Sequence, residues 1–485
     1  MHREAVLTLG LLACVLALGG GCVSADPFGT TRHSPGAPSA RYWGADPGRP
    51  DRRQPRVLPR PGEPLTLAHC IYLALRNSPR ATVSWQTARS SAAAVGQARG
   101  LLLPQVDFTA DAERRQLQVL TEVEDVFLRT TYGASFGVRQ VLLDGGARRA
   151  ALRAAEQDLR VADFLHNSAL LDVALDTEVA YYRLLAARSL LKVAQDTVKQ
   201  RTRHLELAGN RRRAGVGREV EVYQARAERA DAALSLVEAR SEVRVARGRL
   251  ASAMGLAVGF DFDVEPIPTD ATEAERQEVE QLLVEAAQKR PRLRAAAAEV
   301  MRRREQLRTR RAGRWPEVTA DGSYGWRDVH LLPEERKEWT LGLRLRLPIF
   351  TGYRTSYAIR RAEAELDRAI ASYHEELRGA ELQIWEAYSE LVRAEQALQA
   401  AAAFVDSAER SLSAVENAYG AGKATIVELI DAQTTLTRAR NRRATARLDW
   451  HTAIARLERQ VGRSWDRDAP PQPAKAAGTG RQSTD

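Results

Sequence analysis

The feature that most constrains the fold is an internal repeat that covers most of the chain's 485 residues. The dipeptide Ala214-Gly215 recurs as Ala421-Gly422, an offset of 207 residues. The same offset joins two further glycine pairs, Gly145/Gly352 and Gly255/Gly462. Upstream the offset becomes 212, for the proline pairs Pro79/Pro291 and Pro104/Pro316. A repeat of this length predicts that the chain folds as two copies of one structural unit.

Each copy contains a long stretch in which apolar residues recur at alternating steps of four and three. The residue types are identical in the two copies: Ala180, Leu184, Ala187, Leu191, Ala194 and Val198 correspond to Ala387, Leu391, Ala394, Leu398, Ala401 and Val405. This spacing is the seam of a coiled coil. Small Ala between Leu lets helices approach closely. We therefore expect a long helix in each copy, reversing at the Ala-Gly turn into a second helix that runs back.

Before each long helix the apolar period changes from 3.6 to 2. The last such segment is the clearest, because Trp339, Leu341, Leu343 and Leu345 alternate with polar or small residues. The pattern predicts four strands of about ten residues, at 105–115, 131–142, 317–327 and 338–349, each with one apolar face. This length and alternation are typical of barrel strands that span a membrane.

Four strands are too few to close a barrel, and lipid does not tolerate an open sheet edge. We therefore expect several copies of the chain to contribute two strand pairs each. A β-sandwich face would show the same alternation. The Asp and Arg residues on the polar face favour the barrel, since a water-filled pore needs them inside.

The first residues have the pattern of a targeting segment. The apolar run from Ala5 to Leu18 is too short to span a membrane and follows His2-Arg3, which predicts a signal peptide over 1–21. Cys22 comes directly after three glycines, which predicts lipid attachment at its thiol; plain secretion or a buried Cys is the alternative. The Pro-rich residues 22–64 predict an extended, lipid-anchored linker, and 466–485 a disordered tail.

Several classes of function are disfavoured by the composition. The three cysteines and eight scattered histidines form no disulfide framework and no zinc-binding pair. No nucleophile, acid–base or cofactor constellation is evident, so we expect neither an enzyme nor a cofactor. The net charge is +10, but the Arg residues alternate with acids at helical spacing, which indicates solvated helices rather than a nucleic-acid surface. The stretch around Lys423 is not a phosphate-binding loop, because Asn417 and Ala424 replace the required Gly and Ser or Thr.

The order of helix, strand pair and long helical hairpin, written twice, resembles the TolC-like outer-membrane efflux proteins. The matching pieces are VLLDGGARRA at 141–150, PIFTGYRTS at 348–356, AYYRLLAA at 180–187, AYSELVRA at 387–394 and the two Ala-Gly tips. The resemblance implies a mostly α-helical homotrimer with a 12-stranded transmembrane β-barrel, continued by a long α-helical coiled-coil tunnel in the periplasm. It also implies lipid anchoring in the outer membrane, with a periplasmic adaptor and an inner-membrane pump as partners.

The resemblance also implies roles for residues near the second tip. Glu428 and Asp431 match the acids that narrow the periplasmic end of the tunnel, although ordinary solvated helix acids are the alternative. Glu221 and Tyr419 match two members of a latch that holds the tip closed. The third member of that latch, an Arg, is replaced here by Ala424, with Lys423 beside it. The turns expected to face the adaptor are Gly215-Val216-Gly217 and Gly422-Lys423-Ala424.

The predicted organisation is a first repeat over 65–260 with its tip near 214–218, and a second over 261–465 with its tip near 420–425. The expected function is a passive outer-membrane channel of a tripartite efflux system. A secreted coiled-coil structural or adhesion protein is the alternative, but such a rod does not explain four amphipathic strands. Among channels, outlets for drugs, for heavy metals and for secreted proteins (type I secretion) stay open.

Overall fold

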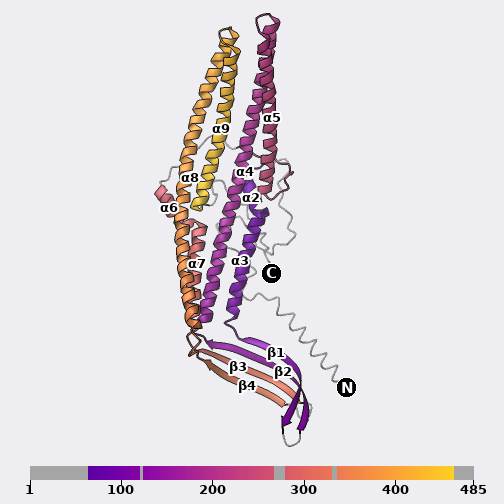
Figure 1. The fold of residues 1–485 in the computed structure, drawn as a ribbon, viewed down its shortest axis with the longest axis vertical. Coiled ribbons are helices and arrows are strands. Elements are labelled where there is room, and N and C mark those ends of the chain that lie inside the picture. Colours follow the sequence, from indigo (N-terminus) through magenta and orange to yellow (C-terminus); the bar gives the residue numbers. More distant parts are fainter. Residues whose placement is uncertain (1–63, 121–123, 267–278, 330–335, 464–485) are drawn as a thin grey trace, which may run out of the picture. The chain divides into compact units, whose positions relative to one another are not determined.

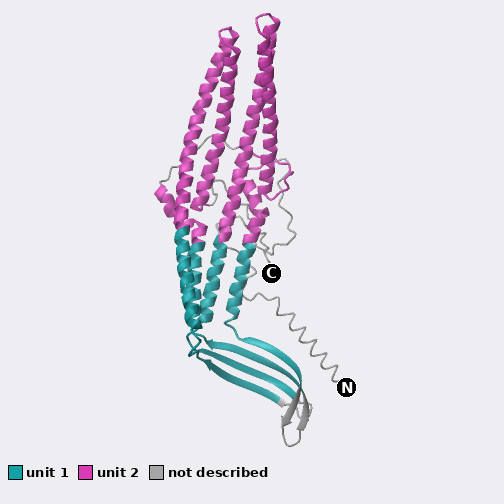
Figure 2. Ribbon diagram, viewed as in Figure 1, with its two compact units in different colours: residues 1–35, 85–164, 295–375 teal, residues 36–84, 165–294, 376–485 magenta. Residues whose placement is uncertain are grey.

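The computed structural model describes residues 64–120, 124–266, 279–329 and 336–463. The expected signal peptide, Cys22, the linker up to residue 63 and the C-terminal tail lie outside these residues. The chain divides into two compact units, coloured separately in Figure 2. Unit 1 holds Trp85–Phe164 and Ala295–Glu375, and unit 2 holds the described parts of 36–84, Leu165–Arg294 and Glu376–Asp485. Each unit combines segments from both sequence repeats.

The order of elements is the same in the two repeats (Figure 1). The first repeat contains α2 (Leu67–Asn77), α3 (Pro79–Gly100), β1 (Gln105–Leu120), β2 (Glu124–Leu143), α4 (Ala147–Arg213) and α5 (Glu219–Ala253). The second contains α6 (Val279–Lys289), α7 (Pro291–Ala312), β3 (Glu317–Val329), β4 (Arg336–Arg346), α8 (Arg354–Gly420) and α9 (Ile426–Val461). Corresponding helices α4 and α8 have the same length, 67 residues, as the shared spacing of their seams requires.

Local sequence explains where these helices begin and end. Pro79 and Pro291 each occupy the first position of a helix, where the missing N–H leaves no hydrogen bond unmade. Gly462 ends α9 in the left-handed conformation, with φ at 82°. No helix in the described ranges is both long enough and apolar enough to cross a membrane.

In unit 1 the four strands form one antiparallel sheet in the order β1-β2-β3-β4, so the two repeats meet where β2 pairs with β3. β1 and β2 have 16 and 20 residues and are longer than the sequence pattern predicts. β4 ends at Arg346, earlier than predicted. Pro348, two residues further on, lacks the N–H that a strand ladder needs.

The register places the alternating apolar residues of all four strands on one face. Phe108 lies opposite Phe136, Phe136 opposite Tyr324, and Tyr324 opposite Trp339. Leu341 on β4 is 78% exposed in the single chain. The sheet therefore presents a continuous apolar surface that water does not favour.

The opposite face of the sheet is polar and charged. Arg139 on β2 forms an ion pair with Asp321 on β3, with 2.8 Å between Nε and Oδ1. Arg327 on β3 lies 3.8 Å from Glu338 on β4. This separation of an apolar and a charged face is the one expected for strands between lipid and a water-filled lumen.

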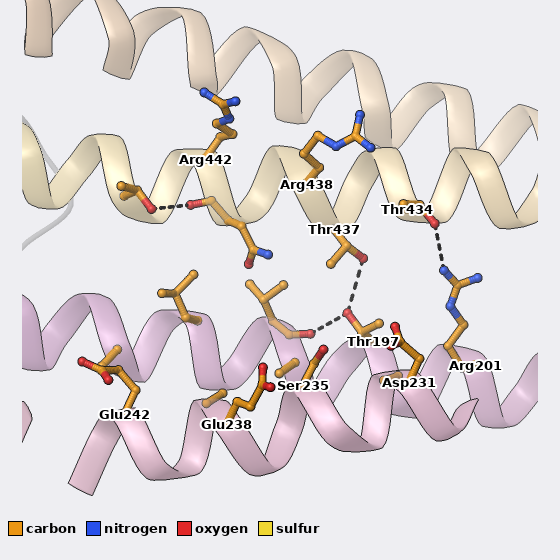
Figure 3. A pocket seen from close by; sticks show the side chains of 18 of the residues that line it. Thr197, Arg201, Asp231, Ser235, Glu238, Glu242, Thr434, Thr437, Arg438 and Arg442 are labelled. Atoms are coloured by element: carbon orange, nitrogen blue, oxygen red, sulfur yellow. Dashed lines mark hydrogen bonds between the residues drawn. The ribbon is translucent and has the colours of Figure 1, made fainter. Parts of the chain in front are cut away.

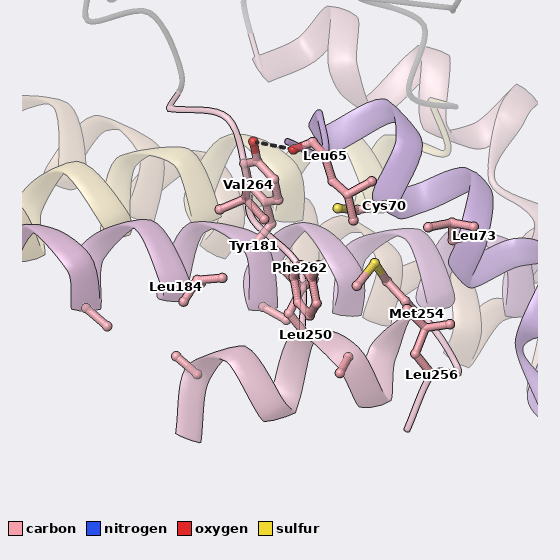
Figure 4. Packing of buried hydrophobic residues seen from close by; sticks show 14 residues of the cluster. Leu65, Cys70, Leu73, Tyr181, Leu184, Leu250, Met254, Leu256, Phe262 and Val264 are labelled. Atoms are coloured by element: carbon pink, nitrogen blue, oxygen red, sulfur yellow. Dashed lines mark hydrogen bonds between the residues drawn. The ribbon is translucent and has the colours of Figure 1, made fainter. Parts of the chain in front are cut away.

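The largest apolar cluster of unit 2 joins α2, α4, α5 and the segment after α5 (Figure 4). Tyr181 is buried in this cluster and donates a hydrogen bond from Oη to the carbonyl oxygen of Glu265, at 2.6 Å. Cys70 is fully buried beside it, and burial raises the pKa of its thiol to about 12. Gly255 turns the chain after α5 with φ at +71°, and an added Cβ would lie 2.7 Å from Cβ of Asn77. Only Gly fits at this turn.

Candidate functional site at the hairpin tips and between the hairpins

The tips of the two hairpins, α4–α5 and α8–α9, are built by the same kind of turn in unit 2. Gly215 has φ at +78° and Gly422 at +73°, and no atom lies within 4 Å of a Cβ added at either. The backbone conformation rather than crowding therefore selects Gly here. Val216 and Lys423 are exposed at these tips. Of the remaining turn residues predicted to face an adaptor, Gly217 and Ala424 are half-buried.

The two acids predicted to form the gate are exposed on the first turns of α9. Glu428 completes a capping box: its Oε2 accepts a hydrogen bond from the Thr425 backbone N at 2.6 Å, and Thr425 Oγ1 accepts one from the Glu428 backbone N at 3.3 Å. Asp431 takes part in no hydrogen bond or ion pair within the described ranges. In the single chain Glu428 thus stabilises the start of α9, while Asp431 leaves its carboxylate available to the solvent.

Tyr419 and Glu221, the two predicted latch residues, lie near one another, and the cation beside them is Arg211. The guanidinium of Arg211 lies over the Tyr419 ring, 4.9 Å from its centroid. Tyr419 is buried, and its hydroxyl has no partner among the described residues. Burial raises the pKa of this hydroxyl, Arg211 opposes the rise, and Glu221 adds to it. Arg211 therefore contacts the ring of Tyr419 and, from Nη1 at 3.5 Å, its backbone carbonyl oxygen, but not its hydroxyl.

Arg211 was not predicted from the sequence. The resemblance implies a cation after the second tip, at the position of Ala424 with Lys423 beside it, whereas Arg211 precedes the first tip. The available signal was the basic run of Arg211 to Arg213 at the end of α4. Because α4 and α8 are distant in sequence, only their packing shows which of these arginines meets Tyr419.

A buried polar cluster joins the two hairpins further from the tips, and Figure 3 shows its contact between Arg201 and Thr434. Arg201 on α4 is 6% exposed. It donates to Gln433 Oε1 on α9 at 2.9 Å and to Thr434 Oγ1 at 3.0 Å. It also lies 3.3 Å from a carboxylate oxygen of Glu228 on α5. One side chain thus connects three helices, and removing a buried charge of this kind leaves its partners unsatisfied.

The orientation of Gln433 fixes the protonation of His204. Since Arg201 can only donate, the Gln433 oxygen must face it, and the Gln433 amide nitrogen faces His204 Nε2 at 2.6 Å. His204 Nε2 is then the acceptor, and the ring proton lies on Nδ1. Burial, with a smaller contribution from Arg201, lowers the pKa of His204 to about 4. The ring is neutral at physiological pH, so the positive charge of this cluster is that of Arg201, which faces the Glu228 carboxylate.

The sequence contains one indication of this cluster, a charged residue at a seam position in only one of the two repeats. The coiled-coil seam steps from Val198 to position 201, so Arg201 occupies a seam position. The corresponding residue of the second copy is Ala408. A polar residue at one seam position often fixes how helices align.

Beside this cluster α4, α5 and α9 enclose an open groove of about 1010 Å³ (Figure 3). Its wall on α5 is acidic and its wall on α9 is basic. The charged residues that line it are Arg201 on α4, Glu228, Asp231, Glu238 and Glu242 on α5, and Arg438 and Arg442 on α9. The described part of the chain holds no group of three His, Cys, Asp or Glu residues suited to a metal ion.

Comparison with known proteins agrees with this architecture. The family model for outer membrane efflux proteins matches residues 70–256 and 282–463. Protein CyaE of Bordetella pertussis is 28% identical, covering 97% of this chain and 98% of CyaE. The outer membrane protein TolC of Vibrio cholerae is 25% identical, covering 77% and 85%. The structure of the outer-membrane channel OprN superimposes with a TM-score of 0.75 at 21% identity, covering 82% and 90%. The chain therefore belongs to the outer membrane efflux protein family and is an outer-membrane efflux channel.

Proposed function

We propose that three copies of the chain assemble into one channel, with a 12-stranded barrel in the outer membrane and a helical tunnel in the periplasm. The observation that carries this proposal is the sheet of unit 1, which has one apolar face, one charged face and two strands, β1 and β4, at its edges. A sheet with free edges is unsuited to lipid, and closure with further copies removes them.

Sedimentation of the purified protein in detergent tests this proposal. We expect a trimer with mainly helical circular dichroism and a strand contribution. A stable monomer that is nonetheless folded would contradict the proposed barrel. The same preparation reconstituted into planar bilayers should conduct ions, which a coiled-coil rod would not.

The proposed channel is passive and receives its substrate from an inner-membrane pump through a periplasmic adaptor. The turn residues Val216 and Lys423 support a docking role for the tips, because they connect the two helices of each hairpin and their side chains are exposed to solvent. Val216→Glu and Lys423→Glu should reduce export in cells while the trimer persists. Export unchanged in the double variant would place the adaptor contact elsewhere.

We further propose that Glu428 and Asp431 form the narrow periplasmic end of the tunnel. They lie three residues apart on α9 and share a face of that helix. Three copies would place six carboxylates around one axis, where crowded like charges attract cations. The residues Tyr419, Glu221 and Arg211 are proposed to hold this end closed.

The gate is best tested by removing charge while keeping shape. Glu428→Gln with Asp431→Asn retains an acceptor for the capping box, since Gln also serves at that position. The variant should lose block by multivalent cations in planar bilayers. Glu156→Gln, on α4 in unit 1, is the control and should leave the block intact. Equal block in the gate variant and the parent would exclude these two acids as the gate.

Cys22 is proposed to carry the lipid that anchors the mature chain to the outer membrane. Its support is the sequence alone: an apolar segment, three glycines and then Cys. Cys22→Ala should abolish fatty-acid labelling of the mature protein. Labelling that survives this substitution would overturn the assignment, whereas retention in the membrane would not, because the barrel holds the chain there as well.

A further inference from the structure

At the end of the sheet where β1 begins and β4 ends, the charges on the polar face are sorted by strand. On β1 the polar-face positions from 105 to 113 carry acids and no cation, namely Asp107, Asp111 and Glu113. On β4 the polar-face positions from 340 to 346 carry the cations Arg344 and Arg346 and no acid. Cross-strand partners share a face of the sheet, so the register places both sets on the same side as Arg139 and Asp321. One edge of the sheet is acidic there and the other basic.

The charges at the start of β1 and the end of β4 differ from those of the inner strands in how they are paired. Arg139 of β2 is paired with Asp321 of β3 inside the chain. In contrast, none of the ion pairs among the described residues involves Asp107, Asp111, Arg344 or Arg346, and all four are exposed. Within the chain, Asp107 and Arg344 act on the Arg139–Asp321 pair only as neighbouring charges. β1 and β4 are separated by three strand spacings, about 14 Å, so these acids and arginines cannot meet within one chain.

The two edges are suited to meet each other on neighbouring copies. β1 and β4 are antiparallel, and the start of β1 and the end of β4 lie at the same end of the sheet, since Gln105 is level with Arg139, Asp321 and Gly342. Pairing β4 with β1 of another copy therefore continues the antiparallel order. It also keeps the apolar faces on one side.

The stagger of a closed barrel decides which residues face each other. Strands tilted by about 35–45° shift the register by about 13–19 Å over four strand spacings, or about four to six residues per chain. A shift of four places Arg344 opposite Asp107. A shift of six places Arg346 opposite Asp107, with Arg344 diagonal to Asp111. The opposite shift would leave most of β1 and β4 unpaired.

We propose that adjacent copies join through an antiparallel β4–β1 seam in which Arg344 and Arg346 of one copy face Asp107 and Asp111 of the next. This inference rests on the proposed trimer and names the residues that align it. A slip by one residue would turn the apolar face inward. A slip by two residues keeps the apolar face outward but changes which charged residues lie opposite one another. The ion pairs therefore distinguish between registers that differ by two residues.

Charge exchange across the seam tests the inference. Asp107→Arg with Asp111→Arg, or Arg344→Asp with Arg346→Asp, places like charges at all three seams. Each double variant should lower the trimer association constant about a hundredfold or more, because small cross-strand terms add over three seams. The fourfold exchange should restore the trimer. The reversal Arg327→Glu is the control, since Arg327 pairs with Glu338 inside the chain, and it should leave assembly intact.

Cross-linking tests the register without reversing charge. Asp107→Cys combined with Arg344→Cys or with Arg346→Cys should form disulfides between copies under mild oxidation, seen as covalent oligomers on denaturing gels. Phe108→Cys with Arg344→Cys should not, because Phe108 lies on the apolar face. If the parent is a trimer but neither rescue nor these cross-links occur, the seam is wrong and the channel proposal stands. If the parent is not a trimer, the channel proposal itself fails.

Discussion

Glu178 provides a quantitative test of how unit 2 is packed. It lies on α4 with 6% of its surface exposed. Burial, and to a lesser degree the negative charge of Glu458 on α9, raise the pKa of its carboxyl from 4.5 to about 8. At neutral pH Glu178 is therefore protonated in the folded protein, although it is ionised in the unfolded chain.

The sign and size of the effect follow from proton linkage. Between pH 4.5 and about 8 the folded state binds one more proton than the unfolded state at this position. The contribution of Glu178 to the free energy of unfolding is therefore largest below pH 4.5. It falls by about 1.4 kcal/mol per pH unit for each chain as the pH rises toward 8. At pH 7.5 the loss relative to acidic pH amounts to about 4 kcal/mol from this residue.

Glu178→Gln keeps the shape of the side chain and removes its ionisation. We expect the variant to be more stable than the parent at pH 7.5 by about 2–4 kcal/mol per chain, and the two to converge toward pH 5. Urea unfolding of the detergent-solubilised protein, followed by helical circular dichroism at pH 5.5, 6.5 and 7.5, measures this difference. Glu206→Gln, at an exposed position of the same helix, is the control. Parallel stability curves for Glu178→Gln and the parent would refute the reasoning.

Three further predictions concern the hairpins and turns. Arg201→Met should destabilise unit 2 by about 3 kcal/mol and speed amide hydrogen exchange around Gln433, since it leaves buried partners unsatisfied. Tyr419→Phe should change the free energy of unfolding by less than about 0.5 kcal/mol, because the Tyr419 hydroxyl is unpaired among the described residues. Tyr419→Ala removes the ring that contacts Arg211, and it should weaken cation block and raise conductance in planar bilayers. Gly255→Ala should lower thermal stability more than Gly422→Ala. Both glycines have positive φ, which costs an Ala about 1 kcal/mol or more, but only at Gly255 would the added Cβ also clash with a neighbouring residue.

The sequence by itself determined the features that depend on local periodicity. The alternating steps of three and four from Ala180 predicted the long helices. The period of two from Trp339 predicted the strands and their two faces. The repeated Ala-Gly dipeptides predicted the turns. These features follow from backbone geometry, because helix and strand each present residues at a fixed period, and positive φ selects Gly. The lengths of the strands were not determined this way, since pairing extends β1 and β2 beyond their clearly alternating parts.

Only the tertiary structure decided which distant residues meet. Arg201 and Gln433 are 232 positions apart, and Arg139 and Asp321 are 182 apart. No local pattern links such pairs, because their proximity results from the packing of α4 against α9 and of β2 against β3. The same holds for the choice of Arg211 as the cation over Tyr419 and for the protonated state of Glu178. Both depend on burial and on the charges of neighbouring helices, and these arise only when segments from the two repeats come together and exclude water.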